Sequence, residues 1–270
     1  MRGFFIHPDD HVGEYRPLEQ WDQLWRPRWW LDPPDDPRRG DWFWLIAILL
    51  LVAYANIIAN EVLANAWHIP FNLGVLGVAL AIARRHQTSW TDMGMRLDRV
   101  PRGAVVGGIV VAAIAVGITF AAAWPETREL FRDDRIIERS TLYLLFDAFV
   151  RVPLATALYE EALFRGVVFG MLSRRMAPLW AALVTSGLFG FWHILPTLET
   201  VKTNPAGGVF AGVFGLTLAS VGAIAGTAAA GMGFMWLRWR ANSIVAPVLA
   251  HIGTNSLAII AGIVVVKILG

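Results

Sequence analysis

The sequence contains no cysteine among its 270 residues. This absence excludes disulfide bonds, a thiolate nucleophile and a zinc site built on cysteine ligands. Charged residues are also scarce at 16%, compared with about 25% in soluble domains, whereas hydrophobic residues reach 56%. The formal net charge of +2 is too small to indicate a nucleic-acid partner. The composition therefore favours a protein whose main surroundings are the lipid bilayer.

Long hydrophobic runs begin near Trp42. We expect residues 1–41, which are polar and contain six arginines, to form an interfacial N-terminal segment. Residues 42–270 then form the transmembrane domain, because a helix crosses the hydrocarbon with about 20 apolar residues. The predicted spans are Trp42–Trp67, Phe71–Ala83 (extended back through Ile69), Ala104–Trp124, Leu142–Leu172, Pro178–Leu195, Val209–Leu237 and Ile244–Leu269.

The predicted fold is all-α, a polytopic transmembrane bundle of about seven to eight helices with an active site inside the membrane. The eighth helix would be a separate one at Leu142–Val150, since Leu142–Leu172 is long for one crossing. Pro153 would kink this run or divide a surface helix from a spanning one.

Basic residues are unevenly distributed between the two sides of this bundle. With the N-terminus in the cytoplasm, the inner segments 1–41, 84–103, 165–177 and 238–243 carry 16 of the 23 basic residues. Lysine and arginine concentrate on the cytoplasmic side of membrane proteins. We therefore expect an integral protein of the plasma membrane with a cytoplasmic N-terminus.

Three short polar clusters interrupt the hydrophobic second half of the chain. In chain order they are Glu160-Glu161-Ala-Leu-Phe-Arg165, Phe189-Gly-Phe-Trp-His193 and His251-Ile-Gly-Thr-Asn255. A charged side chain at the centre of a membrane helix costs about 2.5–3.5 kcal/mol on insertion scales. Such residues usually face one another and carry function, so the clusters predict a water-activating site.

Helical spacing divides the first cluster into two roles. Glu161 and Arg165 are four residues apart and can form an ion pair. Glu160 is rotated about 100° from Glu161 and is free to face a reactant as a general base. The alternative is a buried ion network that only fixes helix packing. Asn56 and Asn60 share a face of the first span, and we interpret them as groups that hydrogen-bond between helices.

Two mechanisms are open for the clusters. In the first, one divalent metal ion, with zinc as the first choice, binds His193, His251 and Glu160 and activates a water molecule. In the second, no metal binds. Glu160 and His193 then activate water directly, while His251 and Asn255 donate hydrogen bonds to the oxyanion. The sequence does not choose between them.

The ordered trio Glu-Glu-x-x-x-Arg, Phe-x-x-x-His and His-x-x-x-Asn resembles the CPBP family of intramembrane proteases. That family includes the type II CAAX prenyl endopeptidases and bacterial bacteriocin-processing and immunity proteins (the ABI family). The similarity covers roughly residues 142–260, the expected catalytic core. It implies an endopeptidase in which Glu160 activates water, His193, His251 and Asn255 complete the site, and Glu161, Arg165 and Phe189 support it.

The implied substrate is a peptide or a membrane-anchored protein, with CAAX-type processing as one option. Two other functions remain open. A catalytically silent scaffold or immunity protein could share the fold, and a proton-coupled transporter could carry similar buried carboxylates and histidines. The intact set of polar residues favours the protease, and the absence of an inverted repeat disfavours the transporter.

Overall fold

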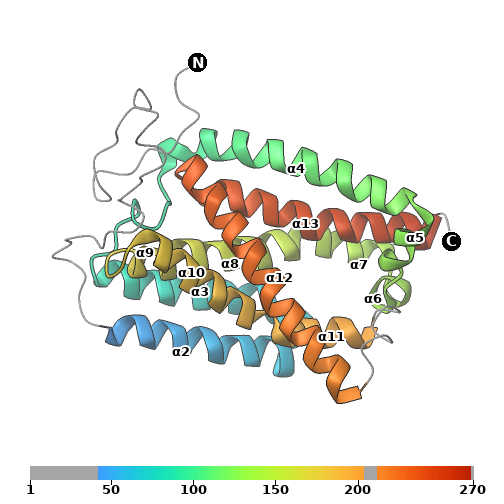
Figure 1. Ribbon diagram of the computed structural model, residues 1–270, viewed down its shortest axis with the longest axis horizontal. Coiled ribbons are helices and arrows are strands. Elements are labelled where there is room, and N and C mark those ends of the chain that lie inside the picture. The colour runs from blue at the N-terminus through green and yellow to red at the C-terminus, as the bar shows by residue number, and fades with distance from the viewer. Residues whose placement is uncertain (1–41, 204–211, 269–270) are drawn as a thin grey trace.

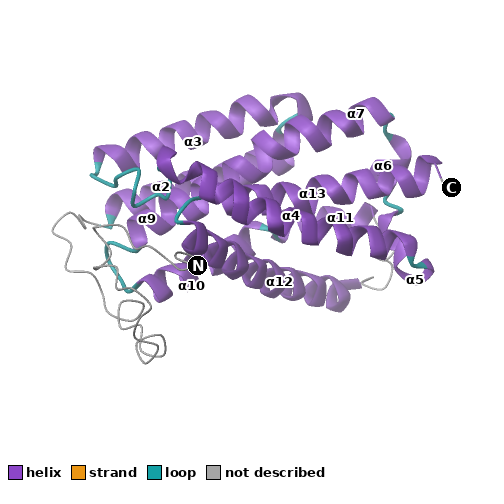
Figure 2. Cartoon of the chain, turned by 90° about the horizontal axis from the view of Figure 1, so that it is seen from above, coloured by secondary structure: helices purple, strands orange, loops and turns teal. Residues whose placement is uncertain are grey.

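The computed structural model describes residues 42–203 and 212–268, and within these ranges every regular element is helical (Figures 1 and 2). Seven helical runs are long and apolar enough to cross a membrane, which confirms the expected polytopic all-α bundle. Helices are favoured there because each satisfies its own backbone polar groups in hydrocarbon. The predicted interfacial segment 1–41 and the start of the predicted span Val209–Leu237 lie outside the described residues.

The first three runs form one part of the bundle. They are α2 (Phe43–Ile57) with the π-helical turn η2 (Ile58–Val62), η3 (Asn65–Trp67) with α3 (His68–Arg85), and η4 (Leu97–Arg99) with α4 (Val100–Ala123). The first span ends at Val62 rather than at the predicted Trp67. Leu63 and Ala64 adopt extended backbone angles there and form a tight turn into α3.

The remaining runs follow a connection that contains α5 (Pro125–Arg128), η5 (Glu129–Phe131) and α6 (Asp134–Glu138). The fourth run comprises α7 (Thr141–Phe146), η6 (Asp147–Leu158), α8 (Tyr159–Glu161), η7 (Ala162–Val168) and α9 (Phe169–Leu172). The last three runs comprise α10 (Pro178–Trp192) with α11 (Ile194–Thr203), α12 (Gly212–Ala241), and α13 (Val245–Ile263) with η9 (Val264–Ile268).

The fourth run is continuous from Thr141 to Leu172, so the separate eighth helix predicted near Leu142–Val150 is not present. Pro153 lies inside η6, a π-helical segment of 12 residues. Proline lacks the N–H of a regular helix and its ring crowds the preceding turn. A wider π-helical turn accommodates it without a break, and such turns are frequent at functional sites.

The second half of this run is the centre of the bundle. Every residue from Tyr159 to Leu172 is buried, which is typical of a helix enclosed on all sides. In Figure 1 these elements, coloured yellow-green to yellow, lie between α2 and α13, and the oblique α12 crosses in front of the run near α8. The polar cluster at Glu160 is therefore held in the middle of the bundle.

Helices α4 and α13 lie side by side in both views and run in the same direction (Figures 1 and 2). Their contact depends on small residues: a Cβ atom on Gly107 would lie 2.8 Å from Cβ of Leu249 and 3.0 Å from the carbonyl oxygen of Ala246. Small residues let membrane helices approach closely. This contact fixes the position of α13, which carries His251.

The turns that follow α3, α9 and α12 meet at one end of the bundle, which we call the basic end. Arg174 donates to the carbonyl oxygen of His86 at 3.0 Å, and the backbone N–H of Ile244 donates to that of Gly94 at 2.9 Å. Gly94 has φ of +68°, a backbone conformation that glycine adopts readily. The arginines at this end are Arg84, Arg85, Arg96, Arg99, Arg102, Arg174, Arg175, Arg238 and Arg240.

Candidate active site

Three helical runs bring the predicted reactive side chains together. Glu160 lies in α8, His193 directly follows α10, and His251 lies in α13. The Oε2 atom of Glu160 is 3.8 Å from Nε2 of His193 and 4.0 Å from Nε2 of His251. These side chains are 9%, 20% and 5% exposed, respectively. The predicted meeting of Glu160 with both histidines is therefore seen in the structure.

Glu161 lies beside this group and is completely buried. Its Oε1 atom accepts a hydrogen bond from Arg165 at 3.0 Å, as the four-residue spacing predicted. The same oxygen lies 2.9 Å from Nδ1 of His251, a contact between residues 90 positions apart. Because a carboxylate accepts, Nδ1 of His251 donates. Glu161 therefore neutralises Arg165 and also orients His251.

Arg165 is enclosed by aromatic rings. Its guanidinium carbon lies 4.0 Å from the ring centre of Phe189 and 5.2 Å from that of Phe234. Within the part of the chain that the structure describes, its Nε and NH2 groups have no hydrogen-bond acceptor. Cation–π attraction, worth about 2 kcal/mol when desolvated, compensates part of this cost. Phe189 thus lies against the buried ion pair, and the resemblance implied a supporting role for it.

The orientation of His193 follows from its own helix. Its Nδ1 atom lies 2.8 Å from the carbonyl oxygen of Phe189. A carbonyl can only accept, so Nδ1 carries the hydrogen and donates. In the neutral ring Nε2 then has a free lone pair, and this atom is the one that faces Glu160. His193 is consequently arranged as a hydrogen-bond acceptor toward the space next to Glu160.

Asn255 is one turn beyond His251 on α13. Its Oδ1 atom accepts a hydrogen bond from Thr254 at 3.4 Å. Among the described residues no hydrogen bond joins Asn255 to Glu160 or to either histidine. The structure thus places Asn255 on the same helix as His251, and its predicted role as a donor to the oxyanion stays a prediction.

Two further polar contacts at the site were not predicted. The indole Nε1 of Trp192 donates to Oε1 of Glu160 at 3.2 Å. Asn56 donates from its side-chain nitrogen to the backbone carbonyl of Trp192 at 3.1 Å. Asn56 was expected to bond between helices, and its partner is the residue next to His193. For Trp192 the available signal was its position between two predicted site residues, Phe189 and His193.

Glycines allow α12 to approach the site closely. A Cβ atom on Gly190 would lie 2.5 Å from the carbonyl oxygen of Ile224, and one on Gly231 would lie 2.9 Å from NH2 of Arg165. Side chains at these positions would push α12 away from α10 and from the buried ion pair. Gly190 of α10 and Gly231 of α12 are therefore required for this close packing around the site.

The predicted metal ligands lie slightly farther apart than the ligand atoms of a tetrahedral zinc ion. Ligand atoms about 2.0–2.2 Å from zinc lie roughly 3.3–3.5 Å from one another. The spacings from Glu160 to His193 and His251 are longer, at 3.8 and 4.0 Å. Across residues 42–203 and 212–268, no group of three histidine, aspartate or glutamate side chains is arranged to hold a metal.

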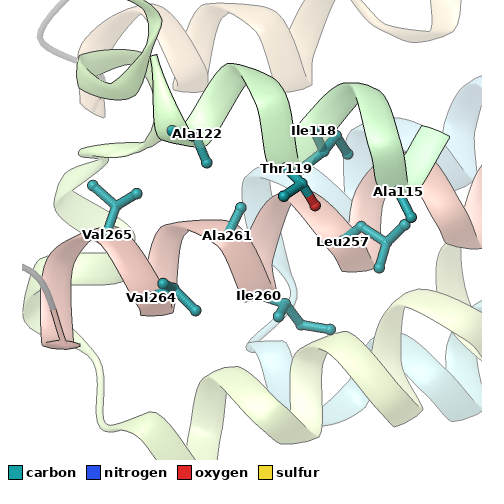
Figure 3. Close-up of a pocket in the computed structure, with 10 residues that line it drawn as sticks. Ala115, Ile118, Thr119, Ala122, Leu257, Ile260, Ala261, Val264 and Val265 are labelled. Atoms are coloured by element: carbon teal, nitrogen blue, oxygen red, sulfur yellow. The ribbon is translucent and has the colours of Figure 1, made fainter. Parts of the chain in front are cut away.

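An apolar groove of about 320 Å³ lies elsewhere, between the distal halves of α4 and α13 (Figure 3). The residues that line it are Ala115, Ile118, Thr119, Ala122, Ala123, Leu257, Ile260, Ala261, Val264 and Val265. None of them is ionisable, and the hydroxyl of Thr119 is the one polar side-chain group. The groove therefore supplies no ionisable side chain.

Residues 142–257 match the family model for type II CAAX prenyl endopeptidase Rce1-like proteins. This range is less than half of the chain, but it contains every predicted site residue from Glu160 to Asn255. It also coincides with the catalytic core expected at 142–260. No curated protein and no solved structure matches the chain.

Proposed function

Because residues 142–257 match the family model of the Rce1-like type II CAAX prenyl endopeptidases, we propose that this integral membrane protein is an intramembrane endopeptidase. It would hydrolyse a peptide bond of a membrane-associated protein or peptide. The observation that carries the proposal is the buried Oε2 of Glu160, which has no hydrogen-bond partner among the described residues. It faces two histidines from two other helices at 3.8 and 4.0 Å.

The 3.8 Å spacing between Glu160 and His193 suits a bridging water molecule. Both groups are acceptors toward it: a carboxylate oxygen on one side and the Nε2 lone pair of His193 on the other. A water molecule that donates one hydrogen to Glu160 and the other to His193 has an oxygen lone pair that points away from both side chains. This lone pair would attack the carbonyl carbon of the substrate while Glu160 takes the proton as general base.

The attack forms a new C–O bond and a tetrahedral oxyanion. Glu160 would then return the proton to the leaving amine nitrogen as the C–N bond breaks. His251 can donate to the oxyanion only when Nε2 also carries a hydrogen, since Nδ1 already donates to Glu161. If His251 is protonated, the buried cluster contains two positive charges, on His251 and Arg165. These balance the two carboxylates of Glu160 and Glu161. Asn255, one turn further on, would supply a second donor.

In this mechanism no metal takes part, which agrees with the long spacings around Glu160. CAAX-type processing, in which the bond after a prenylated cysteine is cut, is the substrate class that the family suggests. A short peptide or a membrane-anchored protein is the broader form of the same proposal.

We also propose that the basic end faces the cytoplasm of the plasma membrane, which leaves the N-terminus on the same side. Nine arginines lie at this end, together with two acidic residues, Asp92 and Asp98, in the described chain. The opposite end carries arginine and acidic side chains in similar numbers along α5 and α6. Such an asymmetry is typical of cytoplasmic loops.

Purified protein in liposomes, incubated with a library of prenylated and unprenylated membrane-anchored peptides, would test the function. Mass spectrometry of new termini is expected to show cleavage at defined bonds. A transporter would instead move a solute across sealed liposomes without producing peptide fragments. A silent scaffold would give neither result, and either outcome would refute the proposal.

A further inference from the structure

Trp192 touches the predicted general base directly. Its indole N–H donates to Oε1 of Glu160 at 3.2 Å, whereas Oε2 of the same carboxylate has no hydrogen-bond partner among the described residues. The two oxygens of Glu160 are therefore in different environments. One is held by the indole, and the other faces the histidines.

The indole is itself held in place by packing. Its ring centre lies 6.0 Å from that of Tyr159 and 5.6 Å from that of Phe164, the latter in an edge-to-face arrangement. Both partners are buried residues of the fourth run. Aromatic contacts of this kind fix ring orientation as well as adding area. The N–H group of Trp192 is thus directed at Glu160 by two neighbours of Glu160 on the same helical run.

The backbone of Trp192 is tied to a third element. Asn56 in α2 donates to its carbonyl oxygen at 3.1 Å, across 136 residues of sequence. Asn60 in turn donates to the side-chain oxygen of Asn56 at 2.8 Å, which orients the Asn56 amide. A chain of hydrogen bonds consequently runs from the end of the first span through Trp192 to Glu160.

We propose that Trp192 is a positioning residue for Glu160, an inference that rests on the endopeptidase function proposed above. By binding Oε1, the indole N–H prevents rotation of the carboxylate and keeps Oε2 toward the water-binding space next to His193. Without this donor the carboxylate can rotate or turn toward His251. A catalytic group held in the productive geometry needs such supporting contacts.

Replacing Trp192 with 3-benzothienylalanine tests the proposal, because a sulfur atom replaces the N–H while the ring shape is retained. We expect kcat to fall about 10- to 100-fold, with KM and the thermal unfolding midpoint close to those of the wild type. The matched control is the same replacement at Trp180, which is 56% exposed on the same helix, α10. An unchanged kcat in the Trp192 variant would overturn the proposal. Equal losses at Trp180 would do so as well.

A second measurement does not depend on activity. In ¹⁵N-tryptophan-labelled protein, the indole N–H resonance of Trp192 should move upfield in Glu160→Ala, because its acceptor is lost, whereas that of Trp180 stays in place. A stationary Trp192 resonance would refute the hydrogen bond. If the wild type cleaves no peptide but the resonance moves, the endopeptidase proposal fails while the contact stands.

Asn56→Leu gives an independent variant in case the isosteric protein does not fold. It removes the donor to the Trp192 carbonyl without changing either partner of the proposed contact. We expect a smaller fall in kcat than for the isostere, with KM unchanged. A rise in KM at constant kcat would instead indicate that this region contacts the substrate, and would contradict a positioning role.

Discussion

His251 Nδ1 lies 2.9 Å from Oε1 of Glu161, the same oxygen that accepts from Arg165. The sequence predicted a reactive group and a separate supporting ion pair. In the structure the two groups meet at one atom, Oε1 of Glu161. Glu161 settles which nitrogen of His251 is protonated and leaves its Nε2 facing Glu160 at 4.0 Å. A change at Glu161 should consequently affect both the stability of the bundle and the chemistry at Glu160.

Glu160→Gln should lower kcat about 10²- to 10⁴-fold, because an amide cannot take the proton from water. The variant should unfold at nearly the same temperature as the wild type, since glutamine retains the shape of the side chain. Peptide cleavage in liposomes and thermal unfolding measure the two effects. Glu61→Gln is the matched control, because Glu61 is exposed at the end of the first span. Unchanged turnover in Glu160→Gln would refute its role as general base.

Arg165→Leu should destabilise the protein by about 3–5 kcal/mol, because it leaves Glu161 as a buried carboxylate without its cation. Both side chains are 0% exposed, so water cannot replace the lost partner. Unfolding by denaturant in mixed micelles measures the loss. Asp98→Asn breaks an exposed ion pair with Arg96 at 2.8 Å and serves as the control, with little expected change. Equal losses of unfolding free energy in the two variants would contradict the claim that the buried ion pair stabilises the protein more than the exposed one.

Activity should survive removal of divalent metal ions. The spacings around Glu160 are longer than those of a tetrahedral zinc site, and the proposed water needs only Glu160 and His193. Elemental analysis of the purified protein, followed by cleavage assays after dialysis against a strong chelator, checks this expectation. Stoichiometric zinc together with loss of activity that zinc restores would select the metal mechanism instead.

Gly190→Ala should destabilise the bundle by about 1–3 kcal/mol and reduce activity, because the new Cβ would overlap the carbonyl oxygen of Ile224. The displacement of α12 from α10 would occur one turn before His193. Gly187→Ala, on the same helix, is a close control because its Cβ would have no neighbour within 4 Å. Thermal unfolding and cleavage rates measured for both variants decide whether the close approach at Gly190 is required.

Local spacing was enough to predict the parts of the site that lie within one helix. The Glu161–Arg165 pair forms at 3.0 Å as expected from residues four apart. Phe189 and His193, also four residues apart, likewise lie side by side, with ring centres 4.4 Å apart. Local spacing left open whether Pro153 kinks or divides the predicted span Leu142–Leu172, because a π-helical segment absorbs the proline without leaving a pattern in the sequence.

The contacts of Trp192 with Glu160 and with Asn56 were beyond the reach of sequence reasoning. Trp192 donates to Glu160 across 32 residues, and Asn56 bonds to Trp192 across 136. Each of these side chains has an ordinary alternative role in a membrane helix, as an aromatic packing residue or a polar contact. Only the relative placement of α2, the fourth run and α10 gives them a shared partner.

The apolar runs and the polar residues within them were enough to predict an all-α membrane bundle and to identify its buried polar groups. In hydrocarbon, apolar runs of sufficient length form helices because the backbone must satisfy its own hydrogen bonds. A charged residue within such a run is costly and therefore rare, so it stands out in the sequence. Tertiary structure alone decided which atoms of those residues meet. Glu160 presents Oε2 to the histidines because Trp192 holds Oε1, and His251 is tied to Glu161 because α13 packs against the fourth run. These choices depend on how helices pack across long stretches of chain, and spacing along a single helix carries no information about them.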